Sequence, residues 1–113
     1  MSFIDASEMT SAEPLSGWKG RFFHSENMTF ATYEVDAEAV AIHEHHHPQE
    51  EVWNVTAGQI AISIDGTEQI LGAGDAAVVP ANAPHHARAL TAATAVIVDY
   101  PVRRQIPGQA HNA

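Results

Sequence analysis

The sequence contains no cysteine, and this absence removes several kinds of site. Disulfides, thiolate zinc sites and a cysteine nucleophile are excluded, so any metal ion must be bound by His, carboxylate or amide groups. Basic residues are also scarce, because five Lys plus Arg stand against fourteen Asp plus Glu, for a formal net charge of −9. This charge repels phosphate backbones and anionic membranes, so we expect neither nucleic acid nor a membrane as a partner.

Long apolar runs are also missing. The sequence has no apolar stretch long enough to span a membrane, and its first residues combine no basic start with an apolar run of signal length. We therefore expect a cytoplasmic protein. A chain of 113 residues is long enough for one domain with a core and too short for two stable ones. We expect an N-terminal arm at 1–16, one domain at 17–106 and a C-terminal tail at 107–113.

No part of the sequence shows a sustained helical period. From Trp18 onward, short segments rich in Val, Ile, Thr, Phe and Tyr alternate with turn residues, at the spacing of about 8–12 residues typical of an all-β sandwich or barrel. Asp65-Gly66 predicts a two-residue hairpin, because a type I′ turn needs positive φ at both central positions. We expect antiparallel strands at 18–24, 28–36, 38–47, 51–55, 59–64, 67–71, 76–79, 85–90 and 94–100.

Histidine is the unusual feature of the composition. Five of the eight histidines fall in two clusters, at 45–47 and 85–86, with His43 just upstream. Alternation along a strand places His43, His45 and His47 on one face and His46 on the other. By the same alternation, His86 and Glu50 are expected at the outer surface.

A carboxylate and a distant imidazole can complete a metal site with these histidines. Glu51 begins the next strand after a short corner, and His85 opens a strand much later in the chain. Together with His45 and His47 they can surround one divalent ion, Fe, Mn, Ni or Zn, while leaving coordination positions open. His43 has three open interpretations, namely an alternative ligand, a contact to the ligands or the substrate, or an interior histidine.

The same residues lie in two motifs that resemble those of the cupins, and the resemblance covers most of the chain. The first motif is His45-x-His47-x3-Glu51-x6-Gly58, and the second is Gly74-x5-Pro80-x-Asn82-x2-His85. The resemblance implies a single-domain jelly-roll (RmlC-like) barrel, often a homodimer, with one metal ion bound by three His and one Glu. Three positions differ from the usual motifs, since Ala39, Asn82 and Ala89 replace glycine, glycine and asparagine, but none of them is an expected ligand.

Within the cupins, the segments 34–60 and 96–105 are similar to pectin-degradation cupins, which open unsaturated uronates. Those relatives carry an aspartate, an aromatic residue and an arginine on and after the last strand. Aligning the prolines places Arg103 on the arginine, but Asp99 on the aromatic residue and Ile97 on the aspartate. The general acid/base of those relatives is therefore not predicted in this chain. Trp53, which shares the parity of Glu51, is expected in the core or the cavity wall.

Three functions follow from these observations. The first is a metal-dependent isomerase or lyase that acts on a small sugar acid or keto acid and uses the metal as a Lewis acid. The sequence does not identify the catalytic residues of this enzyme, for which Arg103, Arg88 and His43 are the candidates. An arginine beside the metal would suit an anionic small-molecule substrate. The second is an iron-dependent dioxygenase of a small organic substrate. The third is a non-catalytic cupin that binds or senses a small molecule.

Overall fold

The computed structural model describes residues 3–104, and in this range it consists of strands joined by turns. The one helical element in this range is the 3-10 helix η1, Ala6–Glu8. The strands are β1 Thr10–Leu15, β2 Trp18–His24, β3 Thr29–Val35, β4 Ile42–His45, β5 Glu50–Ala57, β6 Ile60–Ile64, β7 Thr67–Leu71, β8 Ala76–Val79, β9 His85–Ala89 and β10 Ala93–Tyr100. Within the described residues, no helix is long and apolar enough to cross a membrane.

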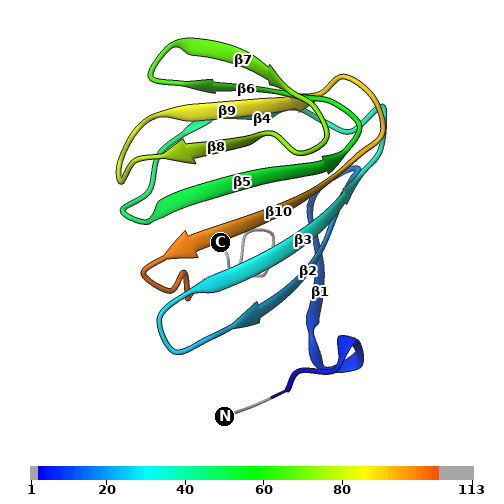
Figure 1. Ribbon diagram of the computed structural model, residues 1–113, viewed down its shortest axis with the longest axis vertical. Helices are drawn as coiled ribbons and strands as arrows, with labels where there is room; N and C mark the ends of the chain where they lie inside the picture. Colours follow the sequence, from blue (N-terminus) through cyan, green and yellow to red (C-terminus); the bar gives the residue numbers. More distant parts are fainter. Residues whose placement is uncertain (1–2, 105–113) are drawn as a thin grey trace.

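The strands form two antiparallel sheets that face each other (Figure 1). The larger sheet has the order β1-β2-β3-β10-β5-β8, and the smaller has the order β4-β9-β6-β7. Because strands that are neighbours in space are often distant in sequence, β10 lies between β3 and β5 and pairs with both. The predicted all-β, antiparallel fold is confirmed.

In the central strands of the larger sheet, buried residues alternate with residues that are half-buried or exposed. In β10 every second residue from Ala93 to Asp99 is buried, and β3 and β5 follow the same period. A period of two is what a strand shows when one face packs on a core. The centre of that core is aromatic, since Tyr33 contacts Trp18 and Phe22 edge-on and Trp18 contacts Trp53, at ring-centroid distances of 5.6–6.2 Å. These strands therefore present one row of inward side chains after another to the space between the sheets.

Two turns have the backbone geometry that the sequence predicts. Asp65 and Gly66 have φ values of 50° and 84°, as a type I′ hairpin between β6 and β7 requires. Asn82 has φ 66° and takes the left-handed geometry of the glycine it replaces. The turn before β9, which positions His85, is thus preserved.

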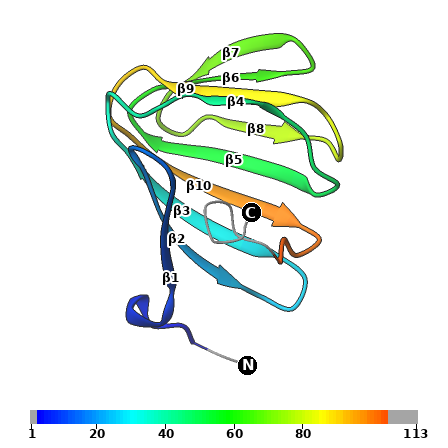
Figure 2. The ribbon, with the colours of Figure 1, turned by 180° about the vertical axis from the view of Figure 1, so that it is seen from behind.

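The segment before Trp18 differs from the expectation of an arm without regular structure. Residues 10–15 form β1, which pairs with β2 at the edge of the larger sheet and is seen from behind in Figure 2. The expected strand 38–47 is also shorter, because residues 36 and 40 hydrogen-bond to the backbone of 16 and 17 and β4 begins only at Ile42. The predicted tail and the last two residues of the predicted domain lie outside the described residues.

Candidate metal centre

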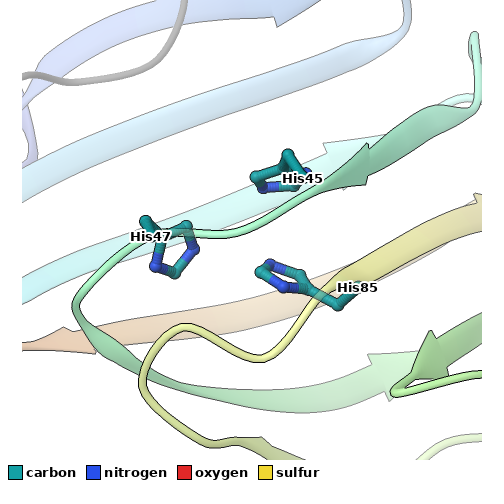
Figure 3. Close-up of side chains that lie close together, drawn as sticks. All are labelled: His45, His47 and His85. Atoms are coloured by element: carbon teal, nitrogen blue, oxygen red, sulfur yellow. The ribbon is translucent and has the colours of Figure 1, made fainter.

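Three histidine side chains converge between the sheets. His45 ends β4, His47 follows it on the corner towards β5, and His85 begins β9 (Figure 3). The pairing of β4 with β9 places His45 opposite His85. The rings of His45 and His85 have centroids 4.3 Å apart, and those of His47 and His85 are 4.9 Å apart. His47 and His85 are buried and His45 is half-buried, so the cluster is largely shielded from solvent.

Glu51 joins this cluster from the larger sheet. It is 4% exposed, and its Oε2 lies 3.4 Å from His47 Nε2 while its Oε1 lies 3.3 Å from His85 Nε2. The Trp53 indole N–H donates to Glu51 Oε1 at 2.8 Å and fixes the carboxylate. Burial raises the pKa of Glu51, but the contacts with His47, His85, Asp99 and Trp53 outweigh burial and hold it well below its usual range. The structure thus brings together all four residues predicted as ligands.

Backbone carbonyls fix which nitrogen of each histidine faces the cluster. The Nδ1 atoms of His45, His47 and His85 each lie 2.9–3.1 Å from a carbonyl oxygen, of residues 43, 49 and 83 respectively. A carbonyl only accepts, so each Nδ1 carries a hydrogen and Nε2 is the atom left for the site. A hydrogen bond from the remote ring nitrogen to a carbonyl is the usual way a protein orients a metal-binding histidine.

The positions of these atoms fit a divalent ion. Two ligands about 2.1 Å from one ion, at tetrahedral or octahedral angles, are roughly 3.0–3.4 Å apart, and the Glu51–histidine distances of 3.3 and 3.4 Å lie at the upper end of that range. The Nε2 atoms of His47 and His85 are buried without a hydrogen-bond partner among the described residues. Buried polar atoms are costly unless satisfied, and an ion between them and Glu51 would satisfy both. The donor set therefore fits a metal.

A second buried carboxylate, Asp99, lies beside Glu51. The register of β5 and β10 pairs Asp99 directly with Glu51, and Asp99, Glu51 and His47 can also place their donor atoms within 4.8 Å of one another. Burial, reinforced by the neighbouring Glu51 carboxylate, raises the pKa of Asp99 to about 8. Two carboxylates that share a buried site are driven towards different protonation states, so Glu51 stays ionised and Asp99 holds a proton.

Arg103 is the cation of the site, as its position in the sequence suggested. Its Nη1 lies 3.7 Å from both Glu51 Oε2 and Asp99 Oδ2, and its side chain is 23% exposed. Thr29 anchors its backbone, because the Thr29 hydroxyl accepts the Arg103 N–H at 2.8 Å and lies 3.2 Å from the Arg103 carbonyl. Arg88, the other candidate, lies on the outer surface of β9 and pairs with Glu68 at 3.2 Å. It does not reach the site.

A cavity of about 230 Å³ adjoins the cluster. His45, Glu51, Asp99 and Arg103 line one part of it, and His43 lies at its border with an exposed side chain. A contact between His43 and a substrate stays a prediction. His46 and Glu50 are exposed, as alternation predicted, whereas His86 is half-buried. The full lining is Pro14, Leu15, Trp18, Phe22, Thr29, Ala31, Tyr33, Ile42, His43, His45, Glu51, Trp53, Ile97, Asp99 and Arg103.

The family model for the cupin domain matches residues 31–101, which include all four clustered residues. The chain belongs to the cupin family. A comparison with curated proteins finds no match. The chain also resembles solved cupin structures at the level of fold. An RmlC-like cupin from Shewanella frigidimarina has a TM-score of 0.82 and 22% identity, with 92% of this chain and 94% of that chain covered.

Two further solved structures have the same fold. KdgF from a Halomonas species has a TM-score of 0.80 at 22% identity, with 90% of this chain and 96% of that chain covered. Oxalate decarboxylase from Bacillus subtilis, described with Mn(II) centres, has a TM-score of 0.72 at 22% identity. The match covers 87% of this chain but only 29% of that one, so this cupin corresponds to one part of the larger enzyme.

Proposed function

We propose that this cupin is an enzyme that binds one divalent metal ion through His45, His47, Glu51 and His85 and catalyses an isomerase or lyase reaction. Its substrate is a small sugar acid or keto acid. The observation that carries the proposal is the placement of Arg103 and Asp99 beside Glu51, where the cavity adjoins the candidate metal centre. A protein that only bound metal would not need both a cation and a protonated acid at this position.

The four clustered side chains would hold the ion, and three neutral imidazoles with one carboxylate suit Fe, Mn, Ni or Zn. When bound, the ion would supply Lewis-acid polarisation of a carbonyl or hydroxyl oxygen of the substrate. Resemblance in fold to a protein described with Mn(II) centres supports the choice of manganese for the first experiments.

Arg103 binds the carboxylate of the substrate. Its guanidinium has five N–H donors, of which Nη1 faces Glu51 and Asp99, so donors remain for a ligand in the cavity. Thr29 anchors the Arg103 backbone, and Glu51 and Asp99 lie 3.7 Å from Nη1, so the guanidinium has partners at the cavity before substrate binds. A prepositioned cation selects anionic substrates and orients them in the cavity.

Asp99 moves the proton. Because burial and Glu51 raise its pKa to about 8, Asp99 is protonated near neutral pH and can act as a general acid. A divalent ion held by Glu51 would reduce the repulsion between the two carboxylates and favour the ionised form of Asp99, so that Asp99 could also accept a proton. Isomerisation and elimination both need a group that gives and takes a proton near the working pH.

The test is turnover by the manganese-loaded protein of a panel of unsaturated uronates and 2-oxo acids, followed by proton NMR and with an oxygen electrode. We expect conversion without oxygen consumption, and a loss of about 100-fold or more in Asp99→Asn at unchanged manganese content. Arg103→Gln should lose turnover, while Arg88→Gln, which changes an arginine outside the cavity, should not. Full activity in Asp99→Asn would contradict the proposed proton transfer. Turnover coupled to oxygen uptake would contradict the isomerase or lyase and favour the dioxygenase.

A further inference from the structure

The cavity beside the metal centre is polar at one end only. Three polar residues lie side by side in one row across the sheet, namely Thr29 on β3, Asp99 on β10 and Glu51 on β5. The next inward row lies two residues further along each strand, about 7 Å away. That next row runs Phe22, Ala31, Ile97 and Trp53, and all four line the cavity. The cavity therefore passes from charged groups to apolar side chains within one step along the sheet.

The indole N–H groups at the apolar end already donate hydrogen bonds within the protein. Trp18 donates its indole N–H to the Val40 carbonyl at 2.7 Å, and Trp53 donates to Glu51. Tyr33 carries the one hydroxyl among the inward aromatic residues of the cavity lining, and burial raises its pKa well above the usual range, so it stays neutral. Leu15 and Ile42 add further aliphatic surface. This end therefore presents carbon surface to a ligand and few donors or acceptors.

One small residue, Ala31, lines the cavity at its apolar end. In the row Phe22–Ala31–Ile97–Trp53, Ala31 is flanked by two large side chains, and its methyl group leaves room that a leucine would fill. A cavity of 230 Å³ has the liquid volume of roughly eight water molecules. It is below the range of about 300–1,000 Å³ that is common for drug-sized ligands, so its occupant is small.

We propose that the substrate is an amphipathic acid, namely a small 2-oxo or 2-hydroxy carboxylate whose tail is an aryl or branched alkyl group. Its carboxylate lies at Arg103, and its tail fills the space over Ala31 between Phe22 and Ile97. A sugar acid satisfies the polar end, but its ring hydroxyls would be buried at the apolar end with few partners, which disfavours binding. This inference rests on the proposed function for the position of the carboxylate, and it replaces the sugar acid by an apolar-tailed acid.

The experiment measures binding, so it is independent of turnover. Isothermal titration of the full-length, manganese-loaded protein uses four probes, which are phenylpyruvate, 4-methyl-2-oxopentanoate, pyruvate and galacturonate. Pyruvate is matched to the first two in its head and lacks the tail. We expect both tailed acids to bind about ten-fold or more tightly than pyruvate, because burying even one methylene in an apolar pocket contributes that order of preference. Galacturonate should bind no better than pyruvate.

Variants separate the head from the tail. Ala31→Leu should abolish the advantage of the tailed acids and leave pyruvate affinity within about two-fold. Arg103→Gln should weaken all acids alike. If Ala31→Leu does not fold, the comparison of the four probes on the unchanged protein still decides the inference.

The outcomes distinguish this inference from the proposed function. Preference for tailed acids without any turnover supports the amphipathic site and contradicts the enzyme proposal. Turnover of a uronate, together with binding of galacturonate as tight as that of phenylpyruvate, supports the enzyme and overturns the amphipathic site. Failure of all four acids to bind at millimolar concentration also overturns it.

Discussion

At the scale of single residues, the carboxylate of Glu51 depends on a tryptophan. The Trp53 indole N–H holds one carboxylate oxygen at 2.8 Å, and this oxygen is the one that faces His85. A hydrogen bond of this kind orients a metal-binding carboxylate, and its loss typically lowers metal affinity by about 10- to 100-fold. Trp53 therefore belongs to the core and the cavity wall, as its parity predicts. Its hydrogen bond to Glu51 in the candidate metal centre was not predicted from the sequence.

We predict that Trp53→Phe lowers the affinity for Mn²⁺ by about ten-fold or more, because phenylalanine keeps the aromatic packing but cannot donate to Glu51. Trp18→Phe is the matched control, since Trp18 is equally buried and its indole N–H bonds to a backbone carbonyl instead. Competition with a metal-sensitive dye measures both variants. Equal affinities in the two variants would show that the Trp53–Glu51 hydrogen bond does not support metal binding.

The residues of the candidate metal centre could be predicted from the sequence, but the proposed proton-transfer residue could not. Strand parity and motif spacing identify His45, His47, Glu51 and His85 because both are local properties. The alignment of prolines placed Ile97 at the acidic position, although Asp99 is the carboxylate that faces Glu51. Ile97 and Asp99 both point inward, and only the pairing of β10 with β5 determines which of them reaches the polar end. Register between strands distant in sequence is not readable from either strand alone.

At the scale of secondary-structure elements, β1 is a strand that the alternation of apolar and polar residues does not predict. Its burial runs exposed, exposed, half-buried, exposed and then two half-buried residues, without a period of two, because it is an edge strand. Pro14, which falls inside the expected arm at 1–16, lies within β1 and lines the cavity with Leu15. Strands with one face fully buried, such as β3 and β10, were predicted to within one residue at each end because alternation is strong there.

The turn after β5 is under the tightest steric constraint. Gly58 has φ 73°, and a Cβ at this position would overlap the carbonyl oxygen of Ala92, which precedes β10. Gly66 in the β6–β7 hairpin has a similar φ of 84°, but a Cβ added there would meet no atom within 4 Å. The two glycines therefore share a left-handed backbone and differ in the space around them.

We predict that Gly66→Ala lowers the free energy of unfolding by about 1 kcal/mol, the cost of left-handed backbone in a residue with a side chain. Gly58→Ala should lower it by clearly more, because the overlap with Ala92 adds to the same backbone cost. Urea denaturation of both variants measures the difference. Equal losses in the two variants would contradict the tight packing of this turn against the start of β10.

At the scale of the whole molecule, the outer face of the larger sheet carries a continuous apolar row. The row crosses five neighbouring strands in register and consists of Phe23, Phe30, Val98, Val52 and Val78. Phe23 and Phe30 stack at 4.9 Å, and Val78 is 55% exposed. Contiguous exposed apolar surface is typical of interaction sites. The homodimer implied by the resemblance to cupins has a candidate surface here.

We predict that the protein is a homodimer in solution and that Val52→Glu, which places a charge in the middle of this row, produces a monomer. Ile70→Glu is the control, because Ile70 is a large exposed apolar residue of the other sheet, 56% exposed on β7. Light scattering after size-exclusion chromatography gives the masses. A monomeric unaltered protein, or dissociation by Ile70→Glu instead, would contradict this prediction.

The fold as a whole followed from the sequence more fully than the cavity did. Turn residues and alternation predict which side chains face inward, but a packed core and a cavity wall use the same apolar residues. The space over Ala31 arises only where β2, β3, β10 and β5 place one small residue among large ones in a single row. The tail of the proposed substrate therefore follows from the structure, whereas the candidate metal ligands follow from the sequence.

Metal content tests the central claim most directly. The protein, purified and then incubated with Mn²⁺ and desalted, is analysed for metal beside His85→Ala and His86→Ala, which alter neighbouring residues of β9. The account predicts one ion per chain in the unaltered protein and in His86→Ala, and loss of the ion in His85→Ala, because His85 is the residue of this pair that turns its Nε2 to Glu51. Equal metal content in His85→Ala and the unaltered protein would contradict the account.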